Sequence, residues 1–446
     1  MLIRSRREFL RDAIRSVSAM GALGALSKFG EMNALAAGNN YQALVCIFLS
    51  GGNDGHNTVI PINTAQQGYS LYASARGALG LPQASLLPIN NGNDVYGLHP
   101  QLSEMQGLYN AGNAAVLANV GMLVEPIDKV AYDTSNSSII PNALFSHSDQ
   151  AGQWQTSIPT GLGNTGWGGR IADLLQSSNT GATFPAATST NGSSLFLTGQ
   201  QTFAANVPAG SATLLNYGNA ARQAGQQQLL TFDNGLQLVQ AANATLGRGV
   251  SYANALSGAL AGATLATQFP SGNPLATQLQ TVARIIKVRS ALGLSRQIFF
   301  CELDGFDTHS GQLAIQSSLL QQLSQAVLAF YQATQELGVD SNVTTFTTSE
   351  FGRSLVPNST GTDHAWGSHH FVIGTGVQGG QFYGQFPTLA LGSDYDATGT
   401  GALIPTSSVD QYGATLAQWF GVGAASLPAI FPNIVNFPTN NLGILG

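Results

Sequence analysis

Apolar runs alternate with segments of helical periodicity along much of this chain. The run from Gln42 to Ser50 (QALVCIFLS) is rich in β-forming residues and predicts a strand buried on both faces. Apolar residues recur at helical spacing over 277–292 and 317–337, and these segments alternate with predicted strands at 296–303 and 342–348. Strands joined through helices run parallel in one sheet. The pattern therefore predicts an α/β fold with a mostly parallel central sheet.

The first 36 residues have a different character. Ser5–Arg11 (SRREFLR) has the twin-arginine pattern, a weakly apolar stretch follows, and Ala34-Leu35-Ala36 offers a cleavage site of small residues. This arrangement predicts a signal peptide over 1–36 and a periplasmic or secreted protein. The remainder, 37–446, is expected to form one large domain, with a Gly-, Ala-, Ser- and Gln-rich capping insertion at about 177–273.

The formal net charge argues against two classes of anionic partner. Residues 1–36 hold six of the sixteen basic and three of the twenty-two acidic residues, so 37–446 carries ten against nineteen, a formal charge of −9. Nucleic acid and anionic membranes both require clustered Lys and Arg, so neither is an expected partner. After the signal peptide, no segment has the roughly 20 apolar residues of a transmembrane helix. The two cysteines, Cys46 and Cys301, lie in separate predicted strands and are expected to be buried thiols.

All seven histidines lie in short stretches flanked mainly by glycine, serine and acidic residues, most of them where a predicted strand ends. Imidazole nitrogens beside carboxylates on a rigid strand edge are the donors that a transition-metal ion prefers. Because parallel strands end at one edge of a sheet, groups that follow these strands should lie close together. The candidate metal ligands are Asp54, Asp304, Asp307, His309, Glu350, His364 and His370.

Several of these assignments have alternatives. Asp54 could instead cap its own loop through an Asx turn. Asp307 could bind the ion directly, or it could orient one of the ligands without contacting the ion. Only one of the adjacent His369 and His370 can face the site, because neighbouring residues of a strand point to opposite faces. Arg353 could hold an anionic substrate or form a structural ion pair.

A candidate nucleophile lies beside another histidine. Ser146 and Ser148 flank His147 in the segment FSHSD, and a bound metal ion could activate either hydroxyl. A turn rich in capping residues would have the same composition.

Taken in order, the segments FLSGGNDGHNTVIP, GLHPQL, SHSDQ, DGFDTH, SEFGRS and DHAWGSHHFVIG resemble the domain-of-unknown-function family 1501 from about residue 43 to 440. That family is grouped with the alkaline phosphatase and sulfatase superfamily. The resemblance implies a three-layer α/β/α sandwich with a two-metal site at the strand ends. It places the superfamily's metal-binding groups on Asp54, on Asp304 with His309, and on His364.

The resemblance breaks at one position. The superfamily's Asp-His pair after the next strand falls on Glu350 and Phe351, so a second ion would lack a ligand, which His147 or His370 could replace. The Cys-x-Pro-x-Arg signature of sulfatases does not occur in the chain.

The leading hypothesis is therefore an exported, metal-dependent hydrolase of phosphate or sulfate esters, small-molecule or glycan, by analogy with the superfamily. Zinc is the expected ion, with magnesium, manganese and calcium as alternatives. The competing hypothesis is a non-catalytic extracytoplasmic binding or assembly protein that keeps the fold. Phe351 favours this second hypothesis, whereas the presence of the other ligands together favours the enzyme.

Overall fold

The computed structural model describes residues 41–446 except 135–137, 162, 211–217 and 234. The predicted signal peptide, 1–36, lies outside the described residues. Within the described part, no helix is long and apolar enough to cross a membrane.

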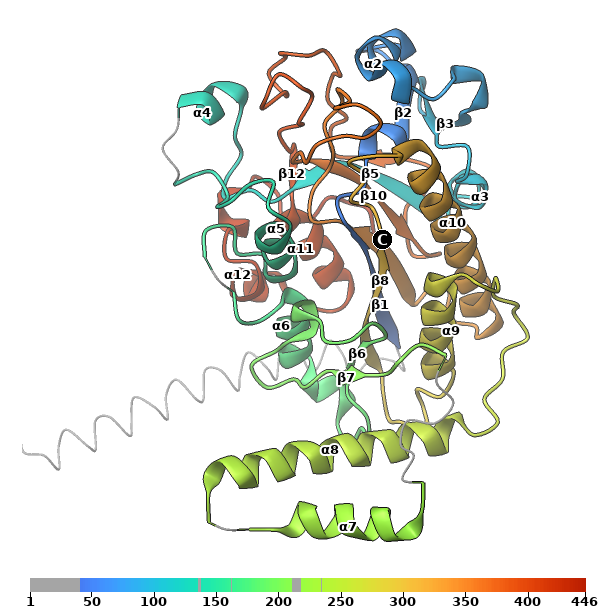
Figure 1. Ribbon diagram of the computed structural model, residues 1–446, viewed down its shortest axis with the longest axis vertical. Coiled ribbons are helices and arrows are strands. Elements are labelled where there is room, and N and C mark those ends of the chain that lie inside the picture. The colour runs from blue at the N-terminus through green and yellow to red at the C-terminus, as the bar shows by residue number, and fades with distance from the viewer. Residues whose placement is uncertain (1–40, 135–137, 162, 211–217, 234) are drawn as a thin grey trace, which may run out of the picture. The chain divides into compact units, whose positions relative to one another are not determined.

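A nine-stranded sheet runs through the centre of the molecule, in the order β11-β5-β10-β9-β1-β8-β6-β7, with β12 beside β5 (Figure 1). Only β10 is antiparallel to its neighbours; every other pair in this sheet is parallel. The predicted mostly parallel α/β sheet is confirmed. The strands are β1 Gln42–Ser50, β5 Ala114–Gly121, β6 Ala187–Ser189, β7 Ala205–Asn206, β8 Arg296–Asp304, β9 Val343–Thr348, β10 Ser368–Ile373, β11 Phe382–Tyr383 and β12 Ser407–Ser408.

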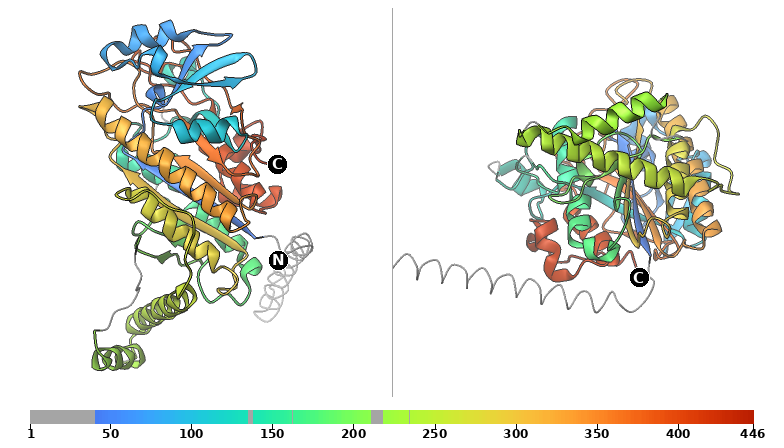
Figure 2. Two further views of the ribbon diagram at one scale, coloured as in Figure 1. Left: turned by 90° about the vertical axis from the view of Figure 1, so that its right-hand side faces the viewer. Right: turned by 90° about the horizontal axis from the view of Figure 1, so that it is seen from below.

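Helices cover both faces of this sheet (Figure 2). Alternate residues of β1 pack into two separate cores: Ala43 and Val45 into the core that holds α3, α9 and α10, Leu44 and Phe48 into the core that holds α5, α6, α11 and α12. The result is a three-layer α/β/α sandwich. The helices are α2 Tyr69–Arg76, α3 Ser103–Asn110, α4 Lys129–Thr134, α5 His147–Thr156, α6 Trp167–Leu174, α7 Ala220–Thr231, α8 Gln237–Leu260, α9 Pro274–Lys287, α10 Gln312–Glu336, α11 Val409–Trp419 and α12 Leu427–Ile430.

The burial of the central strand accounts for the apolar run in its sequence. Strand β1 lies between β8 and β9 and is buried along both faces, so nearly every position is apolar. Cys46 and Cys301, on the neighbouring strands β1 and β8, are both buried free thiols, as expected.

Two parts of the fold were not anticipated. A second sheet, β2-β4-β3, is made by Val59–Asn63, Asp94–Leu98 and Leu87–Asn91. The range 177–273, predicted as an insertion, contributes the short strands β6 and β7 to the main sheet before it forms the pair of helices α7 and α8 (Figure 1).

Candidate metal centre

The parallel strands β1, β8 and β9 end at the same edge of the sheet, and the loops that follow them meet there. Ser50 at the end of β1 is in register with Asp304 at the end of β8. The next residue, Gly51, has a φ of +113°, and a side chain there would collide with the backbone of Asp307. Its N–H donates to Glu350 Oε1 at 2.8 Å. Glycine at this position therefore lets the three loops approach closely.

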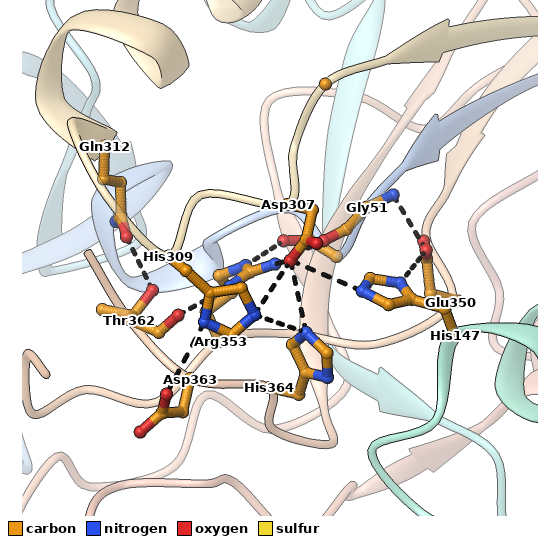
Figure 3. Close-up of polar contacts among 12 residues, drawn as sticks. Gly51, His147, Asp307, His309, Gln312, Glu350, Arg353, Thr362, Asp363 and His364 are labelled. Carbon is orange, nitrogen blue, oxygen red and sulfur yellow. Dashed lines mark hydrogen bonds and ion pairs between the residues drawn. The ribbon is translucent and has the colours of Figure 1, made fainter.

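Three imidazole rings converge on one carboxylate oxygen at this edge (Figure 3). Asp307 Oδ1 lies 3.1 Å from His309 Nε2, 3.2 Å from His364 Nε2 and 3.4 Å from His147 Nε2. The Nε2 atoms of His309 and His364 are themselves 2.9 Å apart. We call these four residues, Asp307, His147, His309 and His364, the Asp307 cluster.

In His147 and His364, the opposite nitrogen of the ring faces an oxygen that can only accept a hydrogen bond. A proton on Nδ1 satisfies that oxygen and leaves the lone pair of a neutral ring on Nε2, directed at the cluster. These two hydrogen bonds join His147 Nδ1 to Glu350 Oε1 at 2.9 Å and His364 Nδ1 to Phe145 O at 2.7 Å. His309 Nδ1 lies 3.6 Å from Asp363 Oδ1, too far for a hydrogen bond.

This donor set fits a transition-metal ion. Three imidazole nitrogens and a carboxylate oxygen suit zinc and its neighbours, whereas magnesium and calcium prefer oxygen ligands. His147, Asp307 and His364 each offer an atom within 4.8 Å of the others. His147 Nε2 is buried and makes no hydrogen bond. The cluster could therefore hold one such ion.

Arg353 fixes the charge of the central carboxylate. Its side chain is 0% exposed and donates to the carbonyls of Gly51, Gly52 and Thr362 and to Asp307 Oδ1. Burial raises the pKa of Asp307, but the hydrogen bond from Arg353 and the charge of Arg353 outweigh it and lower this pKa to about 2. Arg353 is thus the structural ion-pair partner of Asp307, and its burial leaves it little surface for a substrate.

Phe351 forms an apolar support for two of the rings. Its ring centroid lies 4.6 Å from that of His364 and 4.8 Å from that of His147. Gly52, with a φ of +80°, passes so close that any side chain there would collide with the Phe351 ring. The phenyl group therefore positions two imidazoles without offering a donor atom.

The structure gives Asp54 a different role from the predicted one. Its carboxylate forms an ion pair with Arg76, both side chains being fully buried, and also accepts from Gln312 Nε2 and His56 N. Unlike the carboxylate of Asp307, which is 48% exposed, that of Asp54 is 0% exposed and is already held by these three donors, so it is closed to an ion that enters from solvent. Asp54 is a structural anion outside the Asp307 cluster.

Three further candidates also lie outside the cluster. The carboxylate of Glu350 orients His147, and that of Asp304 is exposed and accepts from Gly305 N at 2.7 Å. His370 is buried against Trp154 and Tyr412, with ring centroids 5.0 and 6.1 Å away. Burial lowers the pKa of His370 to about 3.

The two candidate nucleophiles stand at the start of α5, on either side of His147. The Ser146 hydroxyl donates to Asp149 Oδ2 at 2.5 Å, and that of Ser148 to the same oxygen at 3.3 Å. Both serines flank a cluster histidine in the chain, and their hydroxyls contact Asp149. His147 itself was predicted only as a possible replacement ligand; its flanking polar residues were the available signal.

Comparisons with known proteins agree with the sequence motifs. No curated protein matches this chain in sequence. Among solved structures, BT33494S-sulf of Bacteroides thetaiotaomicron is 10% identical (87% of this chain, 74% of that one, TM-score 0.37). The C-terminal periplasmic domain of EcEptC from Escherichia coli, in complex with Zn, is 9% identical (76% and 74%, TM-score 0.33). The PsFucS1 sulfatase from Pseudoalteromonas sp. is 10% identical (93% and 72%, TM-score 0.32).

All three TM-scores lie below 0.5, so these likenesses are weak. The family comparison is stronger, since the sequence pattern described as "Protein of unknown function (DUF1501)" matches residues 41–407. This range includes β1, β8, β9 and every residue of the Asp307 cluster. The chain belongs to the DUF1501 family.

Proposed function

We propose that this protein is an exported, metal-dependent hydrolase of a phosphate or sulfate ester, with one zinc-like ion held by the Asp307 cluster. The observation that carries the proposal is the convergence of three Nε2 atoms on Asp307 Oδ1 at 3.1 to 3.4 Å. Catalytic zinc sites keep a position for water or substrate beside their protein ligands, so catalysis requires the ion to accept one further ligand besides the four donors of the cluster. The export part rests on the twin-arginine pattern of residues 1–36.

The surroundings of the cluster suit a reaction with an external substrate. Asp307 and His309 are 48% and 46% exposed, so an ester could reach the site from solvent. A bound ion would supply Lewis acidity toward an ester oxygen or a water molecule. Glu350 and the Phe145 carbonyl hold two imidazoles in the required tautomer.

Ser146 and Ser148 are the residues that we propose as nucleophiles. Both hydroxyls donate to Asp149 Oδ2, a carboxylate placed to accept a proton from either of them. Arg353 would act through Asp307, whose charge it maintains, and not through the substrate.

One observation favours the competing function, a non-catalytic binding or assembly protein. Among the described residues, the one basic side chain in contact with the Asp307 cluster is that of Arg353, which is 0% exposed. An anionic ester would therefore find no exposed guanidinium or ammonium group in contact with the cluster, and the bound ion would have to provide the attraction. A protein that only binds the metal ion has no such requirement.

Metal content and hydrolysis together test the proposal. We expect about one zinc-like ion per chain by mass spectrometry, lost in the His309→Ala, His364→Ala double variant and kept in Asp304→Asn. Chelator-sensitive turnover of p-nitrophenyl phosphate or sulfate would support the hydrolase. No metal in the parent protein would refute the proposal. Bound metal without turnover across a panel of esters would favour the binding protein.

A further inference from the structure

A groove of about 340 Å³ is lined by residues of helix α8 and of the segments that surround β7, at the end of the main sheet. Figure 1 shows where these elements lie. It shares no residue with the Asp307 cluster. Its apolar lining includes Phe184, Phe203, Val207 and Tyr252, and among the described residues Arg248 from α8 is the one charged residue that lines it.

The floor of the groove is preformed. Phe184 and Val207 are 3% and 2% exposed, and both belong to the main core. The rings of Phe184 and Tyr252 pack edge to face with centroids 6.0 Å apart. Phe203, in contrast, is 56% exposed. A ligand could therefore bury apolar surface on Phe203 without rearranging the floor.

Arg248 adds a positive charge that no acidic neighbour neutralises. Its guanidinium lies 4.4 Å from the Phe203 ring centroid, and Nη2 donates to Thr245 Oγ1 at 3.1 Å. No Asp or Glu lines the groove, and within the described residues no carboxylate forms an ion pair with Arg248. Over 37–446 as a whole, acidic residues outnumber basic ones nineteen to ten, so the charge of this groove is opposite in sign to the net charge of that part of the chain.

We propose that this groove binds a small apolar anion, an aromatic or aliphatic carboxylate or sulfonate. The anionic group lies on the Arg248 guanidinium, whose planar fork of N–H donors suits it. The apolar body packs between Phe203 and the floor formed by Phe184 and Tyr252. This site is independent of the metal centre and of the proposed hydrolase activity.

Binding of two aromatic probes to the full chain tests this site. Anilinonaphthalene sulfonate carries one negative charge, and phenylnaphthylamine is a neutral molecule of similar shape. We expect Arg248→Gln to weaken sulfonate binding roughly tenfold in calorimetric titrations, because a charge-assisted hydrogen bond is lost, and to leave the neutral probe within about twofold. Phe203→Ala should weaken both probes.

Arg222→Gln is the matched control, since Arg222 lies on α7 of the same helical pair and does not line the groove. It should bind both probes as the parent protein does. Equal sulfonate affinity in the Arg248 and Arg222 variants would overturn the proposal. Failure of the parent protein to bind the sulfonate would also overturn the proposal. Binding of anionic lipid vesicles without binding of the sulfonate would overturn it in the same way, because the groove would then not accept a soluble anion.

Discussion

Replacing Glu350 by glutamine should weaken zinc binding although Glu350 is not in the Asp307 cluster. Its side chain is 3% exposed, and Oε1 accepts from His147 Nδ1 at 2.9 Å and from Gly51 N at 2.8 Å. The carboxylate holds the His147 ring in position and makes Nε2 a stronger donor. Glutamine keeps an oxygen acceptor but loses the negative charge.

The expected size follows from this geometry. Partners of this kind, behind a metal-binding histidine, typically change metal affinity 10- to 100-fold, which corresponds to about 1.4–2.7 kcal/mol. The lower end applies if the glutamine oxygen takes the place of Oε1. The upper end applies if the amide nitrogen faces His147, since the hydrogen bond is then lost as well.

The assay is a competitive zinc titration against a chromophoric chelator. Asp304→Asn is the control: Asp304 is an exposed carboxylate at the same sheet edge, bonded to Gly305 N, and its removal should leave the zinc affinity unchanged. If the Asp304 variant loses affinity and the Glu350 variant does not, Asp304 is a ligand and the role assigned to Glu350 is wrong.

Three further predictions concern buried groups. The Asp54→Ala substitution should lower the free energy of unfolding in urea by about 3–5 kcal/mol, because it leaves the charge of Arg76 buried and unpaired. It should not change the zinc stoichiometry, and a loss of zinc from the folded variant would show that Asp54 is a ligand. His370, whose pKa burial lowers to about 3, stays neutral in the fold but is protonated in the unfolded chain below about pH 6.5. As the pH falls from 6.5 toward 3, the unfolded chain binds a proton at His370 that the folded protein does not bind. The free energy of unfolding therefore decreases by about 1.4 kcal/mol per pH unit. The His370→Phe variant should lack this contribution when unfolding is measured between pH 7 and 5. Burial raises the pKa of Asp410 to about 7, so the contribution of Asp410 to the free energy of unfolding falls as the pH rises, but this residue is present in both the parent protein and the His370→Phe variant. An unchanged slope in the variant would therefore contradict the role assigned to His370. Phe351→Ala should cost about 3–5 kcal/mol and weaken zinc binding; unchanged affinity in the folded variant would show that the ring does not position the imidazoles.

The sequence predicted the sheet best where burial is greatest. Strands β1 and β8 match their predicted ranges to within one residue, because a strand covered on both faces contains a continuous apolar run. The sheet β2-β4-β3 was missed, since its strands have five residues each and are only partly buried. The strands β6 and β7, with three and two residues, are too short to produce a periodic signal.

The site was predictable in its location but only partly in its members. Asp307, His309 and His364 follow from the rule that parallel strands end at one edge. The rule does not say which strand-end carboxylate will meet a buried cation, and Asp54 meets Arg76 through packing of α2 that no local pattern shows. Nor does it separate Glu350, which acts through His147, from a direct ligand.

The close approach of Gly51 to Glu350, 299 residues apart in the chain, has a consequence for where the metal ion is acquired. Contacts over such separations form only after synthesis has reached β9, so a partly made chain has no binding site. A twin-arginine leader, as predicted for residues 1–36, directs proteins that fold before export. With such a leader, the ion that fills the Asp307 cluster would be selected by the metal supply of the cytoplasm, not by that of the compartment in which the protein works.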